Sequence, residues 1–318
     1  MAMTVRTTFV GIDVSKEYLD ISSDPQGPTL RVPNQPRDIQ RWLKSLPPGP
    51  VAIALEATST YHLELAMRAH QAGHAVYLID GYRLSRYRDS IAQRAKTDAA
   101  DARLLRRYLV HEHAALRPWD PPARPYARLQ TLLRRRAVLV KTRTALRQSF
   151  DAVPELRQAG QTLVKQITAL DRHIVRQLVR TLSEAGWFHH FQRCRAIEGF
   201  GEVISAAAVT AFHRGPFKNS DAFIAFIGLD VRVRDSGKTR GQRRLSKKGD
   251  PEMRRLLYLA AMQGVKSNTW KPVYQRYLDR GFAKTQALVI IARKLARIAF
   301  ALMKNQSEYR PATAHAGC

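Results

Sequence analysis

The first eighty residues alternate between short runs rich in strand-forming side chains and longer amphipathic runs. Three β-rich runs come first, "TFVGIDVS", "YLDISS" and "TLRVP", separated by charged or Gly- and Pro-containing turns, and they predict three strands. A helix over 37–46, a buried strand "VAIALE", a helix over 61–72 ended by Gly73 and a strand "AVYLID" are expected next. The predicted order βββαβαβ indicates an α/β domain.

Helical periodicity replaces the strand pattern after residue 80. Helices are expected over 82–91 and 98–109, the second with Ala102, Leu105 and Leu109 at helical spacing. The stretch "LRPWDPPARP" then holds four prolines in ten residues and cannot continue a helix. It therefore predicts a domain boundary.

Beyond this boundary the chain predicts two long helices. The run "YARLQTLLRRRAVLVKTRTALRQSF" is amphipathic and basic, and Leu156, Leu163 and Leu170 then repeat every seven residues, with Ile167 and Ile174 between and after them. The helices form either a hairpin packed within one chain or a coiled coil with a second copy. The pattern leaves both open.

The last third is predicted to be mostly helical, with helices over 251–267, 272–279 and 283–305. Before them, the Gly-Phe-Gly turn in "CRAIEGFGEVISAAAVTAF" resembles a helix-hairpin-helix, whose glycines let backbone N–H groups approach a phosphate. An ordinary tight turn between helices uses glycine as well. The predicted division is an α/β domain over 1–115, a linker with long helices over 116–185, a helical domain over 186–306 and a frayed tail over 307–318.

Charge divides the chain more sharply than hydrophobicity does. The 318 residues are 45% hydrophobic, which indicates a globular protein long enough for two domains, and their formal net charge is +27. Residues 1–112 carry 15 Lys and Arg against 12 Asp and Glu, whereas residues 113–318 carry 38 against 14. So large a surplus in one half favours a polyanionic partner, with nucleic acid the first candidate.

Cysteine usage and hydropathy point to the compartment. Cys194 and Cys318 form no CxxC motif and have no zinc-like spacing to histidines, which argues against disulfides and structural zinc. No signal-peptide core and no run of roughly 18 to 20 apolar residues is present in the sequence. We expect a soluble intracellular protein.

Four acidic residues fall where the predicted elements would bring them together. Asp13 lies on the first strand, Glu56 ends "VAIALE", and Asp98 and Asp101 in "KTDAADA" lie three apart near a helix start. Clustered carboxylates raise one another's pKa unless a cation neutralises them, and oxygen ligands without His or Cys favour Mg²⁺ or Mn²⁺. Two such ions roughly 3.5 to 4 Å apart support phosphoryl transfer on nucleic acid.

Each of these acids also has a purely structural interpretation. Asp13 could end a strand, Glu56 could be a solvated edge residue, Asp98 could cap a helix, and Asp101 could add charge to the first helical turn. For one acid alone the structural interpretation is preferable. Taken together, at positions in the order that an RNase H-like fold requires, the four favour a metal site.

A basic loop offers a second kind of chemistry. Ser236 stands beside Gly237 in "DSG", where a loop could present its hydroxyl to a phosphodiester while surrounding cations stabilise the pentacoordinate charge. An ordinary turn residue in a phosphate-binding loop is the alternative, and Ser246 competes as a phosphate contact or a helix cap. The basic residues of the loop are Arg232, Arg234, Lys238, Arg240, Arg243, Arg244, Lys247 and Lys248.

Five motifs together resemble the DEDD transposases of bacterial insertion sequences, the bridge-RNA-guided recombinases. They are "GIDVSK", "ALEATSTYH", "AKTDAADARLL", "FIGLDVRVRDSGKTRG" and "LSKKGDPEMRRLLYLAA", and the resemblance that they carry extends over nearly the whole chain. The chain departs from the family at Val231 and at Glu198, where relatives usually have proline. Both departures bear on loop geometry more than on chemistry.

The resemblance implies a RuvC-like N-terminal domain in which Asp13, Glu56, Asp98 and Asp101 bind Mg²⁺, and a C-terminal transposase domain with Ser236 as the nucleophile. It also implies a transient phosphoserine link to DNA and dimers that assemble into tetramers, in which the metal site of one protomer meets the serine of another. A structured noncoding RNA would pair with target and donor DNA. The implied location is the bacterial cytoplasm, in association with the nucleoid.

Other functions remain open from the sequence. A metal-dependent junction-resolving nuclease would use the same carboxylates without a covalent serine intermediate. An actin-like ATPase or sugar kinase also opens with "GID", but it would need Gly-rich phosphate loops, and the sequence has none. A purely RNA-binding protein would function without Asp13.

Overall fold

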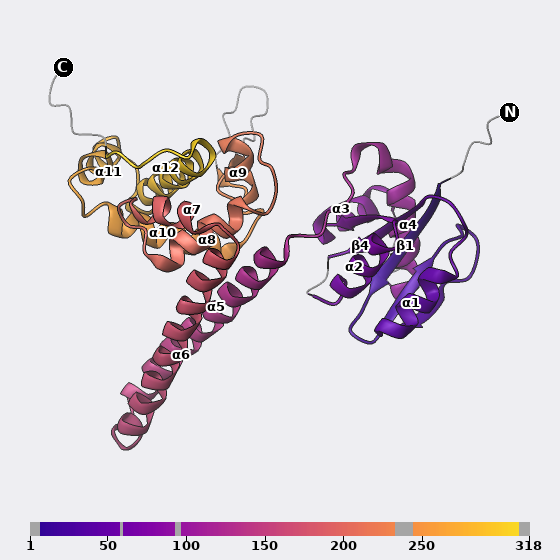
Figure 1. Cartoon of the computed structure of the whole chain (residues 1–318), viewed down its shortest axis with the longest axis horizontal. Helices are drawn as coiled ribbons and strands as arrows, with labels where there is room; N and C mark the ends of the chain where they lie inside the picture. The colour runs from indigo at the N-terminus through magenta and orange to yellow at the C-terminus, as the bar shows by residue number, and fades with distance from the viewer. Residues whose placement is uncertain (1–6, 58–59, 93–96, 233–243, 312–318) are drawn as a thin grey trace. The chain divides into compact units, whose positions relative to one another are not determined.

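The structure is a computed structural model that describes residues 7–57, 60–92, 97–232 and 244–311. Contacts divide the chain into two compact units, Met1–Pro121 and Pro122–Cys318. The first unit is α/β and the second is mostly helical (Figure 1), which confirms the predicted class of each part. Within the described residues, no helix is long and apolar enough to cross a bilayer.

A five-stranded mixed sheet forms the centre of the first unit, in the order β3-β2-β1-β4-β5. The pairs β1–β2 and β2–β3 are antiparallel, whereas β1–β4 and β4–β5 are parallel. This order is consistent with an RNase H-like fold. The strands are β1 (Thr8–Val14), β2 (Tyr18–Ser22), β3 (Leu30–Pro33), β4 (Val51–Glu56) and β5 (Ala75–Ile79).

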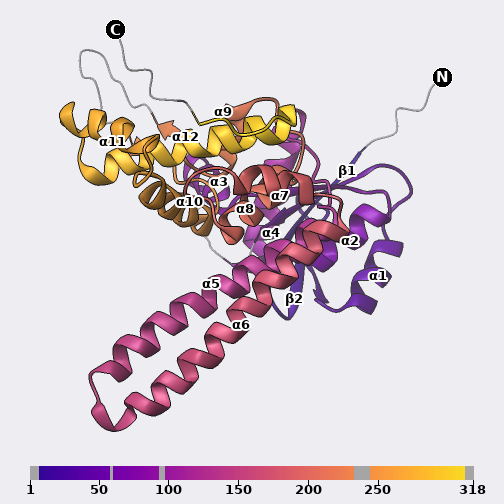
Figure 2. The same ribbon diagram turned by 60° about the vertical axis from the view of Figure 1, so that its left-hand side comes forward.

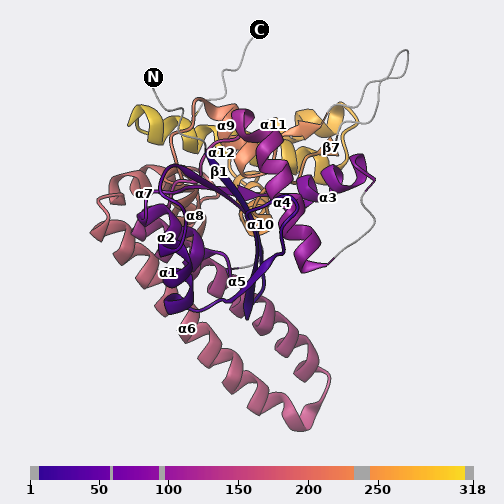
Figure 3. The same cartoon turned by 90° about the vertical axis from the view of Figure 1, so that its right-hand side faces the viewer.

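Helices cover both faces of this sheet (Figure 3). Helices α1 (Pro36–Lys44) and α2 (Leu63–Gln71) lie on one face, where Val10 and Ile12 of β1 are fully buried. Helices α3 (Gly81–Ser90) and α4 (Asp98–Glu112) lie on the other. Because side chains alternate along a strand, the residues between the buried valines and isoleucines of β1 face α4.

Gly11 explains how closely α4 approaches β1. A Cβ atom on Gly11 would lie 2.2 Å from the backbone oxygen of Ala102 and 2.2 Å from the backbone nitrogen of Arg106. Only glycine allows this contact. The glycine of "GID" therefore lets α4 pack directly against the strand that carries Asp13.

The second unit begins with the two predicted long helices, α5 (Arg124–Asp151) and α6 (Arg157–Glu184). They form a hairpin whose far end projects from the other helices of this unit (Figure 2). The short helix η2 (Pro154–Leu156) makes the turn between them. The hairpin within one chain is thus present.

The remaining helices of the second unit enclose its hydrophobic core, in which Phe223 and Ile291 are fully buried. Helix α10 ends at Gly264 rather than at the predicted Ser267, because Ser267 closes a hydrogen-bonded turn onto Gly264. The elements are α7 (Phe188–Arg195), α8 (Glu202–Phe212), α9 (Ser220–Phe226), β6 (Val231–Arg232), β7 (Arg244–Leu245), α10 (Pro251–Gly264), α11 (Trp270–Asp279) and α12 (Lys284–Asn305).

Candidate active site

Asp13 and Glu56 lie side by side at the ends of two parallel strands. In the β1–β4 ladder Ile12 pairs with Leu55, so Asp13 and Glu56 occupy the next step. Ile12 and Leu55 are buried on the α1–α2 side. The two carboxylates therefore face α4 on the opposite side of the sheet.

A third strand carboxylate, Asp20, belongs to the same cluster. The antiparallel register pairs Asp13 with Asp20 of β2, and Asp20 is 5% exposed. Asp20 was not among the residues predicted for the site. A signal was present, since a tight turn over Ser15–Tyr18 in "DVSKEYLD" places the two aspartates opposite each other.

Helix α4 contributes the remaining two acids in its first turn. Thr97 is the N-cap, and its side chain accepts a hydrogen bond from the backbone N–H of Ala100 (3.2 Å). Asp98 and Asp101 are the first and fourth residues of the helix. The interpretation of Asp98 as the helix cap is therefore wrong, because Thr97 fills that role.

Negative charge converges on Asp13. Burial, and then the charges of Asp101, Asp98, Glu56 and Asp20, raise the pKa of Asp13 to about 6. Among the described residues, Asp13 has neither a hydrogen bond nor an ion pair that would offset this repulsion. Three members of the predicted tetrad, Glu56, Asp98 and Asp101, thus lie near the fourth, Asp13, which has no positively charged partner among the described residues.

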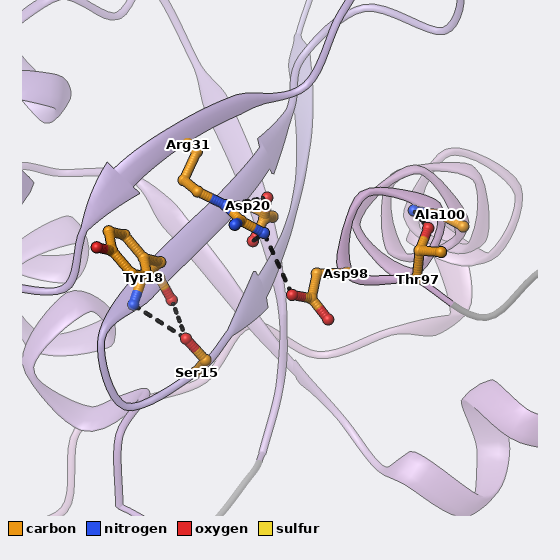
Figure 4. A network of polar contacts seen from close by, with 7 residues as sticks. All are labelled: Ser15, Tyr18, Asp20, Arg31, Thr97, Asp98 and Ala100. Carbon is orange, nitrogen blue, oxygen red and sulfur yellow. Dashed lines mark hydrogen bonds and ion pairs between the residues drawn. The ribbon is translucent and has the colours of Figure 1, made fainter.

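Two arginines hold the surrounding acids. Arg31 on β3 donates two hydrogen bonds of 3.0 Å to Asp20 and one of 3.3 Å to Asp98 (Figure 4). Arg88 on α3 donates a 2.7 Å hydrogen bond to Asp101, and both side chains are largely buried. Neither arginine was predicted to belong to the site, because nothing in their local sequence patterns distinguishes them from the many surface arginines.

Glu56 has space reserved for its carboxylate. A Cβ atom on Gly81, the first residue of α3, would lie 2.5 Å from Oε1 of Glu56. Any larger residue at position 81 would displace this carboxylate. Glycine at position 81 thus leaves room for the Glu56 carboxylate where the structure places it.

The oxygen donors of this cluster suit Mg²⁺ or Mn²⁺ by chemistry. In the described parts of the chain, however, no three His, Cys, Asp or Glu side chains are grouped tightly enough to form a closed metal site. Asp98 and Asp101 turn toward Arg31 and Arg88 instead. The arrangement is a set of converging carboxylates whose outer members are held by arginines.

The second candidate site, around the basic loop, is described only at its base. Strands β6 and β7 pair Val231 with Leu245 and Arg232 with Arg244. Lys247 and Lys248 follow, and the backbone of Lys247 is left-handed (φ 55°). Outside the described residues lie Ser236 and the loop cations Arg234, Lys238, Arg240 and Arg243.

Ser246 has a defined structural role at this base. Its hydroxyl donates a hydrogen bond to the carboxylate of Asp230 and accepts one from the backbone N–H of Lys248 (3.2 Å). Asp230 and Ser246 are also joined through their backbones. The cap of α10 is Asp250, which accepts from the backbone N–H of Glu252 (2.8 Å), so the interpretation of Ser246 as that cap is wrong.

The Gly-Phe-Gly turn between α7 and α8 is fitted tightly to α10. Gly199 has a left-handed backbone (φ 88°), and a Cβ atom there would lie 2.2 Å from the carbonyl oxygen of Ala260. Packing therefore requires this glycine. A Cβ atom on Gly201 would meet nothing within 4 Å, so only the Gly201 end of the turn is open to a ligand.

Glu198 precedes this turn and anchors it to the end of the chain. It accepts hydrogen bonds from the Thr269 hydroxyl (2.6 Å), the Trp270 indole N–H (3.2 Å) and the Tyr309 hydroxyl. The prediction of a frayed tail after residue 306 is wrong at Tyr309. The half-buried carboxylate at position 198 gives that tyrosine a hydrogen-bond acceptor that a proline side chain could not.

Comparison with known proteins identifies this combination of units. A model described as "Transposase", for the DEDD transposase domain of IS110 elements, matches residues 10–159. A second, "Transposase IS116/IS110/IS902 family", matches residues 192–277. The chain is thus a DNA transposase or recombinase.

More narrowly, the chain belongs to the IS110 family of insertion-sequence transposases. The pilin gene-inverting proteins of Moraxella bovis and Moraxella lacunata are each 26% identical to it over 95% of this chain and 97% of the relative. A probable family 20 transposase of Pseudomonas aeruginosa is 34% identical over 49% of this chain and 46% of the relative.

Proposed function

We propose that the chain is an RNA-guided, site-specific recombinase of an insertion sequence, which cuts and exchanges DNA strands through Ser236 with the help of a divalent metal site. The observation that supports this most directly is the convergence of four acids on Asp13, whose burial, together with their charges, raises its pKa to about 6. Such a cluster is unfavourable without a cation. A cation bound among these carboxylates would offset that cost.

Asp13, Glu56, Asp98 and Asp101 would hold the metal, once Asp98 and Asp101 turn away from Arg31 and Arg88. A bound Mg²⁺ would supply Lewis-acid stabilisation of the phosphoryl oxygens. The two arginines would keep the outer acids in place when no metal is bound. Asp20, paired to Arg31 by two hydrogen bonds, would remain outside the ligand set and position Arg31.

Ser236 would act as the nucleophile. Its hydroxyl oxygen would attack the phosphorus of a phosphodiester, form a phosphoserine ester and release the other strand end as a hydroxyl. The proposal rests on the family resemblance of the "DSG" motif. The paired strands β6 and β7, with the Asp230–Ser246 hydrogen bond, give this loop a firm base.

Strand joining, rather than cleavage alone, is favoured by the relatives. Pilin gene-inverting proteins match nearly the whole chain, and inversion of a gene requires both cutting and rejoining of DNA. This favours the recombinase over a junction-resolving nuclease. The proposal that a structured noncoding RNA guides the reaction rests on the family resemblance and agrees with the strongly basic composition of the second unit.

The long hairpin offers a surface for assembly into dimers and tetramers. Leu156, Leu163 and Leu170 are 46%, 44% and 48% exposed. They form a stripe at seven-residue spacing that the hairpin itself leaves uncovered. A second copy of the chain could pack on this stripe.

The test compares Ser236→Ala with Asp13→Asn in a strand-exchange assay on donor and target DNA, with the element's RNA present. The wild type is expected to yield a covalent protein–DNA adduct on denaturing gels, and Ser236→Ala is expected to yield none. Asp38→Asn, an acid-to-amide change on α1, is the matched control for Asp13→Asn. Undiminished cleavage by Ser236→Ala would overturn the serine mechanism in favour of the nuclease.

A further inference from the structure

A basic pocket lies on the first unit, next to the converging acids along α4. It has a volume of about 480 Å³ between α4 and the end of β2. Arg103, Arg106, Arg107 and His111 of α4 line it, together with Ser22 at the end of β2. The described residues that line it include no Asp or Glu, so the pocket is suited to an anion.

The arginines of the pocket differ in what they contact. Arg106 is held in place by the backbone, because its Nε donates to the carbonyl oxygens of Phe9 and Ser23 (both 3.1 Å). Arg103 and Arg107 are exposed, and within the described residues neither forms an ion pair. They lie one helical turn apart on the same side of α4. The side chains of Arg103 and Arg107 therefore lie on the same side of α4, and neither has an acidic partner among the described residues.

The position of the pocket relates it to the acids. Ala100, between Asp98 and Asp101, lines the pocket as well, so α4 belongs to both features. At 1.5 Å rise per residue, Arg103 and Arg107 lie about 7 to 14 Å along the helix from Asp98. Ser22 lies two residues beyond Asp20 on the α4 side of β2. A polyanionic strand reaching the acids could therefore continue into this pocket.

We propose that this pocket binds phosphates of the DNA backbone through Arg103, Arg107 and His111, and so holds the strand that leads to the acids. The inference rests on the proposed function in taking DNA as the substrate. Arginine suits the role, because its planar donors match phosphate oxygens and its charge releases counterions. The carboxylates repel a DNA strand, and adjacent arginines would offset that repulsion.

The test measures equilibrium binding of the full-length protein to a fluorescent DNA oligonucleotide by anisotropy, over a range of salt concentrations and with EDTA present. The double variant Arg103→Gln/Arg107→Gln is expected to bind ~10-fold more weakly, with a salt slope smaller by about 2. The matched control, Arg37→Gln/Lys44→Gln, removes the same charge from α1 on the opposite face of the sheet. It is expected to change affinity less than about 2-fold.

A second series changes charge without touching the arginines. Val110 lines the pocket and is 41% exposed. Val110→Glu should weaken binding, Val110→Lys should strengthen it, and Val110→Gln should fall between them. Thermal unfolding of each variant shows whether the fold is intact.

The outcomes separate this inference from the proposed function. The pocket proposal is overturned if the arginine variant and the α1 control lose the same DNA affinity. It is also overturned if the DNA affinities of the Val110 variants do not follow the order Lys, Gln, Glu from strongest to weakest. Loss of binding to an RNA oligonucleotide but not to DNA would overturn it as well. The proposed function fails separately, if Asp13→Asn supports strand exchange, and that result leaves the binding measurements unaffected.

Discussion

The two units of this protein differ in how they use charge. The first, Met1–Pro121, is nearly balanced, with 16 Lys and Arg against 13 Asp and Glu, yet it concentrates its acids around Asp13. The second, Pro122–Cys318, carries 37 against 13. The difference shows that a nearly neutral unit can still hold a dense cluster of acids, which net charge alone does not reveal.

The largest expected effect separates chemistry from binding. Asp13→Asn should lower the strand-exchange rate by about 10³-fold or more, because it removes a charge at the centre of the acid cluster. Affinity for DNA should stay equal to or slightly above that of the wild type, since a repelling charge is lost. Strand-exchange rates and anisotropy on the same preparation test both statements.

The same variant should also be more stable at neutral pH without metal. Ionised Asp13 opposes folding, because its pKa is about 6 in the folded chain against 3.8 for an unperturbed group. After allowance for solvent screening, the gain should be about 1 to 2 kcal/mol in the first unit. Equal stability of variant and wild type would contradict the repulsion that the structure indicates.

A second prediction compares the glycines on which each unit depends. Gly11→Ala would push α4 away from β1. Gly199→Ala would push the α7–α8 turn away from α10, and it would also place a side chain on a residue with a left-handed backbone conformation. Each should lower the free energy of unfolding of its own unit by about 2 to 4 kcal/mol. Calorimetry should show one shifted transition in each case. Gly215→Ala, where a Cβ atom meets nothing within 4 Å, is the control expected to shift neither.

Acidification should act on the units in opposite directions. In the second unit, His190 and His213 lie 3.0 Å apart between ring nitrogens, and burial followed by neighbouring positive groups lowers the pKa of each to about 4. Their folded pKa values lie below the unfolded value of 6.5, so stability is full above about pH 6.5 and falls toward pH 4.

The first unit should gain stability over much of the same range. The pKa of Asp13 is raised, so the folded chain takes up a proton as the pH falls through about 6, and metal-free stability rises toward pH 4. Thermal unfolding between pH 7 and pH 5 in EDTA measures both trends. His190→Gln/His213→Gln should flatten the trend of the second unit only, and a parallel decline of both units would contradict the assignment.

The smallest expected effect lies in the basic surface itself. Arg232→Gln and Lys247→Gln, both at the base of the β6–β7 loop, should each weaken DNA binding by about 2- to 5-fold and reduce the salt slope by ~1. Lys16→Gln, an exposed lysine of the first unit, is the control. If all three variants lose the same affinity, binding depends on net charge rather than on this loop.

Local patterns predicted most of the fold. Alternating β-branched runs defined the strands around Asp13, and prolines near residue 120 preceded the start of α5 at Arg124. Positions such as Tyr309 were misjudged, because a polar tail with few apolar residues looks unpacked until its partner, Glu198, is known. The half-exposed leucines at 156, 163 and 170 show the reverse case, since a heptad pattern indicates burial without saying by which chain.

The sequence by itself determined the α/β and helical classes, the division of charge, and Asp13, Glu56, Asp98 and Asp101 as candidates for one site, because these follow from periodicity and composition. Only the tertiary structure showed that Asp20 faces Asp13, that Arg31 and Arg88 hold the outer acids, and that Arg103 and Arg107 line a pocket. Those relations join residues from different strands and helices. They depend on strand register and helix packing, which no local pattern specifies.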